Sequence, residues 1–239
     1  MLFLLKKIKF YTSPYFPIRY LMLRDIKYIN KKYLLKGKAL DVGCGEKPFK
    51  KEFCIINEYI GIDFKGFSTN KDLNREKPDF YFSSSYLNDL RLPFKSESFE
   101  NVFSFQVLEH HKNYTKLLEE MIRVAKSSGN IMITAPFLYP LHEIPNDFQR
   151  ITPFGIMQEL KKYNVEITEI IKEGSLFTTF SMLMNESLNQ FASKNNFYYF
   201  LSIFIFLPLL IFQYISLTLD KFIKIESVFC NYLILIRKK

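Results

Sequence analysis

The residues whose types and spacing suit chemistry begin with two glycines. Gly43 and Gly45, two of only 8 glycines in 239 residues, follow a short apolar run in the segment ALDVGCGEKP. Glycine lets the backbone approach a ligand, and the first turn of a following helix could donate hydrogen bonds to an anionic group. Asp63 follows Gly43 by 20 residues, the spacing at which a carboxylate reaches ribose hydroxyls. Pro48 stands where a dinucleotide-binding loop has its third glycine, so the predicted ligand is a single nucleoside with a small charged group.

All three histidines lie in two segments that follow predicted strands. His110 and His111 come after the apolar run Val102–Val107, and His142 comes after Ile131–Ala135. Ligands of open α/β sheets bind at the carboxyl ends of strands, and histidine is the usual proton acceptor near neutral pH. We therefore expect His110 and His142 to be catalytic if the acceptor is a hydroxyl. A surface or purely structural histidine is the alternative at each position.

Short apolar runs that alternate with polar or helical segments must position these residues. They are typical of strands buried on both faces of a parallel sheet, with helices as crossovers. Helices are expected at Ile18–Tyr33 and Tyr114–Lys126. The predicted strands are Ala39–Val42, Tyr59–Asp63, Phe80–Phe82, Val102–Val107, Ile131–Ala135, Val165–Ile171 and Tyr232–Ile236.

Four segments, LDVGCG, YIGID, LPFKSESFENVFSFQVLEH and EEMIRVAKSSGNIMITAP, resemble the class I S-adenosylmethionine-dependent methyltransferases, in particular the type 11 group. The resemblance extends from about Lys38 to Pro136. It implies a Rossmann-like α/β fold, with a mostly parallel sheet, an antiparallel last strand and helices on both faces, and S-adenosyl-L-methionine as cofactor. The residues that it implies around the cofactor are Asp41, Gly43, Cys44 and Gly45 at the methionine part, Asp63 at the ribose, Asn88 or Asp89 at the adenine, and Gln106 facing the pocket.

The segment PFLYPLHEIPNDFQRITPFG follows the fifth predicted strand and is rich in functional groups. It resembles the HE-x-P-x-DF-x-R-x-T pattern of methyltransferases of glycan and lipid-linked saccharide biosynthesis, where this loop borders the acceptor pocket. The resemblance implies that Glu143, Asp147 and Arg150 contact the substrate. A plain turn around Pro145 and Asn146 is the alternative.

No metal site is predicted. The three cysteines, Cys44, Cys54 and Cys230, form no CxxC motif, so neither a zinc site nor a disulfide framework is indicated, and a reducing cytosol fits best. Glu109 and His110 resemble the carboxylate and imidazole of a quinone-pathway methyltransferase that uses Mg²⁺. Most relatives of this fold need no metal, however.

The positive charge of the chain is concentrated near its beginning. The formal net charge is +9, and residues 1–51 hold 13 Lys and Arg against 3 Asp and Glu. Such a segment could contact nucleic acid, an anionic membrane surface or only solvent. With 48% hydrophobic and 24% charged residues, the chain is too apolar for a disordered protein and too charged for a multi-span membrane protein.

Residues 197–219 form an uncharged apolar segment of 23 residues. As a straight helix it would measure about 34 Å, against about 30 Å of hydrocarbon in a bilayer. A single crossing would separate the final strand, Tyr232–Ile236, from its sheet. We therefore expect Pro208 to break the segment into a re-entrant helix pair that enters one leaflet from the cytoplasmic side, although a count of apolar residues alone gives one transmembrane helix. A buried helix of a soluble core is the alternative.

The sequence thus predicts a basic arm or helix at 1–37 and a methyltransferase domain at 38–239, with a hydrophobic helical insertion before the final strand. The expected acceptor is a small or lipid-linked saccharide, methylated on a hydroxyl at the membrane surface, and no nucleic-acid partner is expected. The alternatives are a nucleic-acid methyltransferase that uses the basic arm and a non-catalytic membrane scaffold that binds the cofactor. Oligomeric state does not follow from the sequence.

Overall fold

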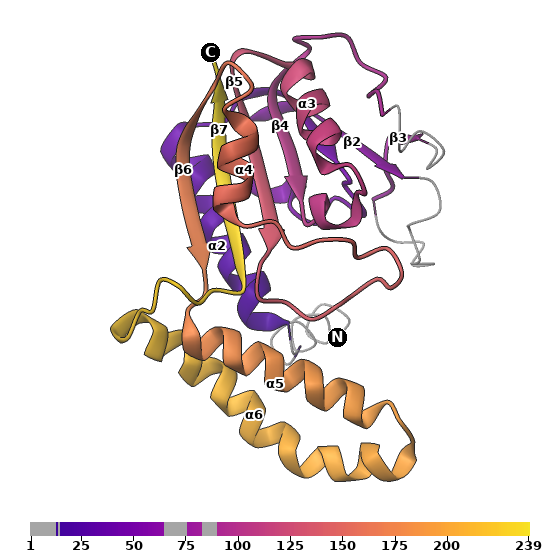
Figure 1. Cartoon of the computed structure of the whole chain (residues 1–239), viewed down its shortest axis with the longest axis vertical. Helices are drawn as coiled ribbons and strands as arrows, with labels where there is room; N and C mark the ends of the chain where they lie inside the picture. Colours follow the sequence, from indigo (N-terminus) through magenta and orange to yellow (C-terminus); the bar gives the residue numbers. More distant parts are fainter. Residues whose placement is uncertain (1–12, 14, 65–75, 83–89) are drawn as a thin grey trace. The chain divides into compact units, whose positions relative to one another are not determined.

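The computed structural model describes residues 13, 15–64, 76–82 and 90–239, and the chain forms two compact units (Figure 1). We call them the sheet unit and the hairpin unit. The sheet unit comprises Asp25–Pro136, Leu141–Ile171 and Tyr232–Lys239. The hairpin unit comprises Met1–Arg24, Phe137–Pro140 and Lys172–Asn231.

Seven strands form one sheet in the order β3-β2-β1-β4-β5-β7-β6. The pairs β1 with β2, β1 with β4, β2 with β3, and β4 with β5 are parallel. Strand β7 runs the opposite way, since Lys239 N bonds to Asn164 O before β6 and Cys230 N bonds to Glu173 O at its end. The expected mostly parallel sheet with an antiparallel last strand is confirmed. The bounds are β1 Gly37–Val42, β2 Ile56–Phe64, β3 Phe80–Phe82, β4 Phe99–Phe105, β5 Ala125–Pro136, β6 Val165–Glu173 and β7 Asn231–Lys238.

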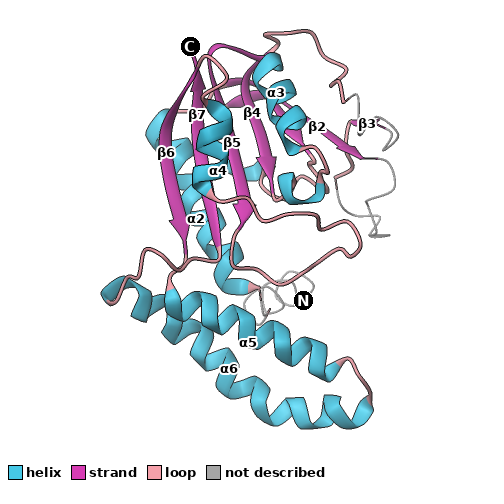
Figure 2. Ribbon diagram, viewed as in Figure 1, coloured by secondary structure: helices cyan, strands magenta, loops and turns pink. Residues whose placement is uncertain are grey.

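Helices cover both faces of this sheet (Figure 2). Helix α3 connects β4 to β5, and Asn113 caps its first turn by accepting a hydrogen bond from Lys116 N at 3.1 Å. Thr152 caps α4 in the same way, through Gly155 N at 2.9 Å. The bounds are α2 Phe16–Tyr33, α3 Tyr114–Val124, α4 Pro153–Leu160, α5 Leu176–Ala192 and α6 Asn196–Phe222, with short 3-10 turns η1 at Lys50–Glu52 and η3 at Leu108–His110.

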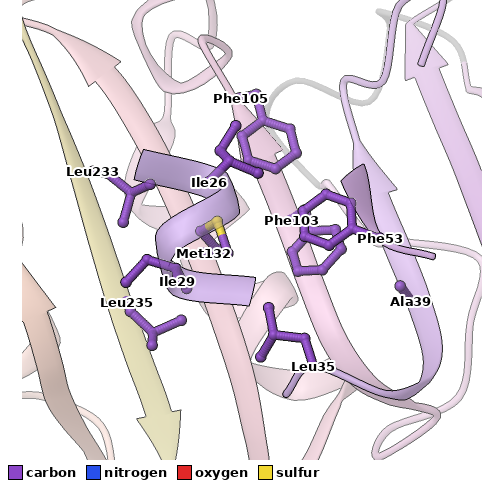
Figure 3. Close-up of a cluster of buried hydrophobic side chains, with 10 residues drawn as sticks. All are labelled: Ile26, Ile29, Leu35, Ala39, Phe53, Phe103, Phe105, Met132, Leu233 and Leu235. Atoms are coloured by element: carbon purple, nitrogen blue, oxygen red, sulfur yellow. The ribbon is translucent and has the colours of Figure 1, made fainter. Parts of the chain in front are cut away.

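The main core lies between α2 and the middle of the sheet (Figure 3). Ile26 and Ile29 are fully buried on α2, and the rings of Phe53 and Phe103 stack with centroids 4.4 Å apart. Burying side chains of this size stabilises a fold by about 1.5–3 kcal/mol each. The cluster comprises Ile26, Ile29, Leu35, Ala39, Phe53, Phe103, Phe105, Met132, Leu233 and Leu235.

The structure differs from expectation after the glycine loop. No α-helix lies between β1 and β2, whose residues the structure describes throughout, and the chain makes only the 3-10 turn η1 before β2 begins at Ile56. A turn of three residues has no helix dipole to offer an anion. The hydrogen bonds expected from a helix N-terminus are therefore not available at this loop.

Helices α5 and α6 form an antiparallel hairpin (Figure 1). Pro208 lies inside α6, which is one continuous helix of 27 residues. The expected break into two half-helices is therefore wrong. The hairpin is instead formed by α5, which the sequence did not predict, together with the whole apolar segment. Both of its ends lie together, because Asp220 near the end of α6 accepts a hydrogen bond from Ser175 N, just before α5, at 2.9 Å.

Candidate functional site

The glycine loop after β1 has the backbone freedom that a ligand cradle needs. Gly43 and Gly45 have φ values of 73° and 49°, in the left-handed region. A Cβ at Gly43 would fall 2.4 Å from Cγ2 of Val107, whereas one at Gly45 would meet no atom of the described residues within 4 Å. The loop is tied to β2, because Ile62 O accepts hydrogen bonds from the N–H groups of Gly43 and Cys44. Gly43 is thus needed for packing, while Gly45 borders open space.

Two buried aspartates stand beside this loop. Asp63 ends β2 and accepts hydrogen bonds from Gly45 N at 2.9 Å and Phe64 N at 2.7 Å. Asp41 accepts one from Tyr59 Oη at 2.6 Å, and its other oxygen is buried without a hydrogen bond. Burial raises the pKa of both carboxyls, that of Asp41 to about 7. An ammonium group, such as that of a methionine moiety, would satisfy the Asp41 oxygen.

Sequence reasoning missed an ion pair under the loop. The Lys47 side chain is 3% exposed, and its Nζ lies 2.6 Å from Oδ2 of Asp79, which also accepts a hydrogen bond from Gly61 N. A Cβ at Gly61 would fall 2.5 Å from Cε of Lys47, so this glycine leaves room for the lysine. The signal in the sequence is the glycine inside the apolar strand segment YIGID, because a glycine within a strand often marks a place where another part of the chain approaches the backbone closely.

The remaining predicted cofactor residues are placed as follows. Gln106 follows β4, where its side-chain Nε2 lies 3.2 Å from Thr134 Oγ1 and its backbone N bonds to Thr134 O. Cys44 is buried in the glycine loop, and burial raises the pKa of its thiol. Asn88 and Asp89 lie outside the described residues.

A second group of polar residues forms where the turn after β4 meets the loop after β5. Phe148 N donates a hydrogen bond to Glu109 O at 2.9 Å. The side chain of Gln149 donates to the carbonyls of Leu108 and His111 at 3.1 and 2.8 Å. Segments about 40 residues apart in sequence are therefore held together by backbone-directed hydrogen bonds.

Glu109, His110 and His142 are the centre of this group. Oε1 of Glu109 lies 3.8 Å from Nε2 of His110 and 3.9 Å from Nε2 of His142. The two imidazole rings are close to perpendicular, with centroids 4.7 Å apart. Glu109 is 1% exposed, and within the described part of the chain neither of its carboxylate oxygens has a hydrogen-bond partner. Burial raises the pKa of this carboxyl to about 8.

Both imidazole rings are oriented by contacts at Nδ1, on the side away from Glu109. Nδ1 of His110 lies 2.8 Å from Asn146 O, and Nδ1 of His142 lies 3.2 Å from Oδ2 of Asp147. Arg150 binds both oxygens of Asp147, with Nη2 at 2.7 Å from Oδ2. Burial acts to raise the pKa of Asp147, but the hydrogen bonds from Arg150 and from His142 N hold it below its usual value. Each imidazole therefore has a fixed orientation.

The five predicted catalytic and substrate residues lie in this one region, with different surroundings. Asp147 is 1% exposed in its side chain and bonds to Arg150 and His142. Glu143 is 59% exposed, and its Oε2 lies 3.9 Å from Nε2 of His110. His111 points elsewhere: it packs on the Phe64 ring, and burial lowers the pKa of its imidazole.

The part of the chain that holds the glycine loop is similar to a known protein family. Residues 40–133 match the family Methyltransf_11, described as a methyltransferase domain. An uncharacterized protein of Methanocaldococcus jannaschii is 26% identical over 154 residues, 64% of this chain and 58% of that protein. The chain spans between 46% and 62% of the length of the curated relatives it matches.

Solved structures share the fold at low sequence identity. A S-adenosylmethionine-dependent methyltransferase from Mesorhizobium loti superposes with a TM-score of 0.53 at 14% identity, over 95% of this chain and 98% of that one. The [4+2]-cyclase SpnF superposes with a TM-score of 0.54 at 15% identity, over 90% and 80%. The fold therefore serves more than one reaction. The family match includes Asp63, Glu109 and His110, whereas the loop with His142 follows it.

Proposed function

Starting from residues 40–133 as a methyltransferase domain whose cofactor is S-adenosylmethionine, we propose that the protein methylates a hydroxyl of a saccharide, small or lipid-linked, at a membrane surface. The observation that carries the acceptor class is the group of Glu109, His110 and His142 after β4 and β5. A hydroxyl must lose a proton when it is methylated, and this group provides basic atoms at the strand ends where ligands of such sheets bind.

The cofactor, when bound, supplies a methyl carbon on a positively charged sulfur, which leaves as a neutral thioether. Binding is assigned to Asp41, Asp63 and the glycine loop, and orientation of the acceptor to Glu143 and Arg150 at the edge of the histidine group. His110 and His142 provide the basic nitrogen atoms that accept the proton of the acceptor hydroxyl. Transfer then depends mainly on bringing the acceptor oxygen into line with the methyl carbon.

The polarity of the hairpin supports a membrane location. Its buried positions are mostly polar, and Nδ2 of Asn185 on α5 lies 3.5 Å from Oε1 of Gln213 on α6. Many of its exposed positions are large and apolar. The buried polar residues are Thr178, Thr179, Ser181, Asn185, Gln213 and Ser216, and the exposed apolar ones include Phe180, Phe204, Ile205, Leu207, Ile211, Ile215 and Phe222.

This arrangement is the reverse of an amphipathic helix in water and is typical of helices that pack together in lipid. Phe204–Phe222 is long and apolar enough to cross a membrane, and only 17% of it is buried. The two ends of the hairpin lie together at Ser175 and Asp220, so both are on one side of the membrane, and we assign a re-entrant insertion from that side rather than a single crossing. Free Cys44, Cys54 and Cys230 suit the cytoplasmic side.

Charge contributes less to this membrane contact than the sequence suggested. Several lysines of the basic N-terminal region are paired within the sheet unit, including Lys32 with Glu169 at 2.7 Å and Lys38 with Glu58 at 3.1 Å. Paired charges attract an anionic surface only weakly. The apolar face of the hairpin is therefore the main support for the membrane proposal.

The acceptor is tested with S-adenosylmethionine labelled in its methyl group, incubated with the protein and membranes of its source. Label is expected in organic-phase lipid-linked glycan and is expected to resist alkali, because an O-methyl ether is stable where a methyl ester is cleaved. Asp63→Ala should abolish cofactor binding and transfer, whereas His142→Ala should keep cofactor binding and reduce transfer about 100-fold. Label in RNA would instead support a nucleic-acid methyltransferase, and cofactor binding without label in any fraction would support a scaffold.

A further inference from the structure

Glu109, His110 and His142 are spaced as ligands around a common centre. One ligand atom from each lies within 4.8 Å of the others. A metal ion bound at about 2.0–2.2 Å from each of three N or O atoms holds those atoms roughly 3–4 Å apart. The separations of 3.8 and 3.9 Å from the carboxylate oxygen to the two imidazole nitrogens fall within that spacing, and a small inward turn of the rings would bring all three atoms, which lie within 4.8 Å of one another, onto one ion.

The contacts behind the two rings select the nitrogen that would bind an ion. Asn146 O accepts only from a protonated Nδ1 of His110, so the lone pair of the neutral ring is on Nε2. Asp147 beside Nδ1 of His142 favours the same tautomer. Histidines that bind metals commonly donate their other N–H to a carbonyl or carboxylate, which fixes the ring and increases its basicity. Here one ring has the carbonyl and the other has the carboxylate.

The Glu109 carboxylate supplies an independent reason. It is 1% exposed, its Oε1 lies within 4 Å of both Nε2 atoms, and neither oxygen has a hydrogen-bond partner among the residues that the structure describes. A buried carboxylate with so little compensation is destabilising, because it has lost its water, and its own backbone N–H and the charge of Arg150 only partly offset that loss. The imidazoles lie too far away for hydrogen bonds, which require about 3 Å. A cation between the three groups satisfies the carboxylate and uses both lone pairs.

We propose that Glu109, His110 and His142 bind one divalent transition-metal ion, with Zn²⁺ as the ion that these ligands suit best. Two imidazoles and one carboxylate are a known catalytic zinc ligand set, and they disfavour Mg²⁺ and Ca²⁺, which prefer oxygen ligands alone. Three protein ligands leave a position for one more oxygen, and a bound ion lowers the pKa of a hydroxyl placed there. Binding of the ion does not depend on which acceptor the protein uses. Its role in lowering the pKa of the acceptor hydroxyl rests on the proposed function, and in that role the ion replaces direct removal of the proton by an imidazole.

The test measures ion binding by tag-free full-length protein, without reference to activity. Wild type is titrated with Zn²⁺ against a chromophoric chelator, and with Co²⁺ while its visible absorption spectrum is recorded. We expect one ion per chain and a Co²⁺ spectrum typical of nitrogen and oxygen ligands. Glu109→Gln and His142→Ala should each weaken Zn²⁺ binding at least about 100-fold, and Asp147→Asn about 10- to 100-fold.

Two controls match these variants. Glu159→Gln changes another largely buried glutamate, on α4, and His111→Asn removes the histidine that points away from the group. Both should bind Zn²⁺ as wild type does, and circular dichroism with thermal melting checks that every variant folds. If Glu109→Gln does not fold, Asp147→Asn and the wild-type Co²⁺ spectrum still test the site.

Absence of stoichiometric binding by wild type, or Glu109→Gln binding as tightly as wild type, would overturn the proposal. These results are distinguishable from failure of the proposed function. Labelled lipid-linked glycan formed by a protein that binds no metal would leave the function intact and refute the site. Stoichiometric Zn²⁺ binding by a protein that methylates no hydroxyl would support the metal site and refute the proposed function.

Discussion

The phenol of Tyr59 donates a 2.6 Å hydrogen bond to Oδ2 of the fully buried Asp41, one strand away in the sheet. This single bond is all that Asp41 receives from the described residues, since its Oδ1 has no hydrogen-bond partner. The carboxyl pKa is raised to about 7, chiefly by burial. Ionised Asp41 is therefore unfavourable in the folded protein without cofactor.

Asp41→Asn should stabilise the fold in a pH-dependent way. The folded pKa of Asp41 is above its ordinary value of 3.8, so the unfavourable contribution grows as pH rises from 3.8 to about 7 and is constant above. Each pKa unit corresponds to about 1.4 kcal/mol, so the variant should gain about 2–4 kcal/mol at about pH 8 and little at about pH 4. Urea unfolding across this pH range measures the gain, and an equal gain at both ends would contradict the assignment.

Alanine substitutions at the two loop glycines should show that Gly43 matters for packing and Gly45 for contact with the ligand. Gly43→Ala brings a Cβ to 2.4 Å from Val107 and requires a positive φ, so it should lose about 2–4 kcal/mol of stability. Gly45→Ala places its Cβ near no atom of the residues seen in the structure and should lose only about 1 kcal/mol, while still reducing S-adenosylmethionine affinity. Thermal unfolding and calorimetric titration check both, with Val107→Ala expected to restore part of the Gly43→Ala loss.

Introduction of negative charge on the apolar face of α6 should release the protein from lipid. Phe204 and Leu207 are 68% and 60% exposed, and glutamate at both should abolish co-flotation with phosphatidylglycerol vesicles. Phe154→Glu is the control, because Phe154 on α4 is 75% exposed but belongs to the sheet unit. Wild-type binding should persist in about 0.5 M NaCl, since salt screens charge but not apolar insertion. Loss of wild-type binding in salt would indicate an electrostatic contact instead.

Asp220 should stabilise the start of α5. Its carboxylate accepts hydrogen bonds from the backbone N–H groups of Phe177 and Thr178, each at 3.0 Å. Asp220→Ala removes a cap and a favourable charge at a helix N-terminus, an effect of about 1 kcal/mol or more. Amide exchange at Phe177 and Thr178 should accelerate about tenfold. Lys221→Ala, at the next residue of α6, should leave exchange unchanged.

The strands were predictable because buried parallel strands are apolar on successive residues. The run Phe80–Phe82 is β3 as observed, and β1, β2, β6 and β7 extend their predicted cores by only a few residues. Strand β5 begins at Ala125, six residues before the predicted start, because a register shift against β4 carries Ser127–Gly129 along the sheet. Such a shift has no apolar pattern to reveal it.

The histidine group was predicted only in part. Sequence position placed His110 and His142 at strand ends, which the fold brings together. The burial of the Glu109 carboxylate, whose oxygens have no hydrogen-bond partner among the described residues, depends on how the later loop folds over η3, through Phe148 and Gln149. Helix α5 was missed for a related reason. Its buried face is mostly polar, and the exposed residues of its first half are apolar, which is the reverse of the pattern that predicts helices in water.

The place of β7 inside the sheet has a consequence for the order of folding. It lies between β5 and β6, and nearly 100 residues separate it from β5 in the chain. Closing so long a loop is entropically slow, so β7 should join after the parallel strands β1 to β5 have formed. Until then one edge of β5 and both edges of β6 are unpaired and prone to pair with other chains. Expression yield should therefore fall steeply when polar residues replace Leu233 and Leu235.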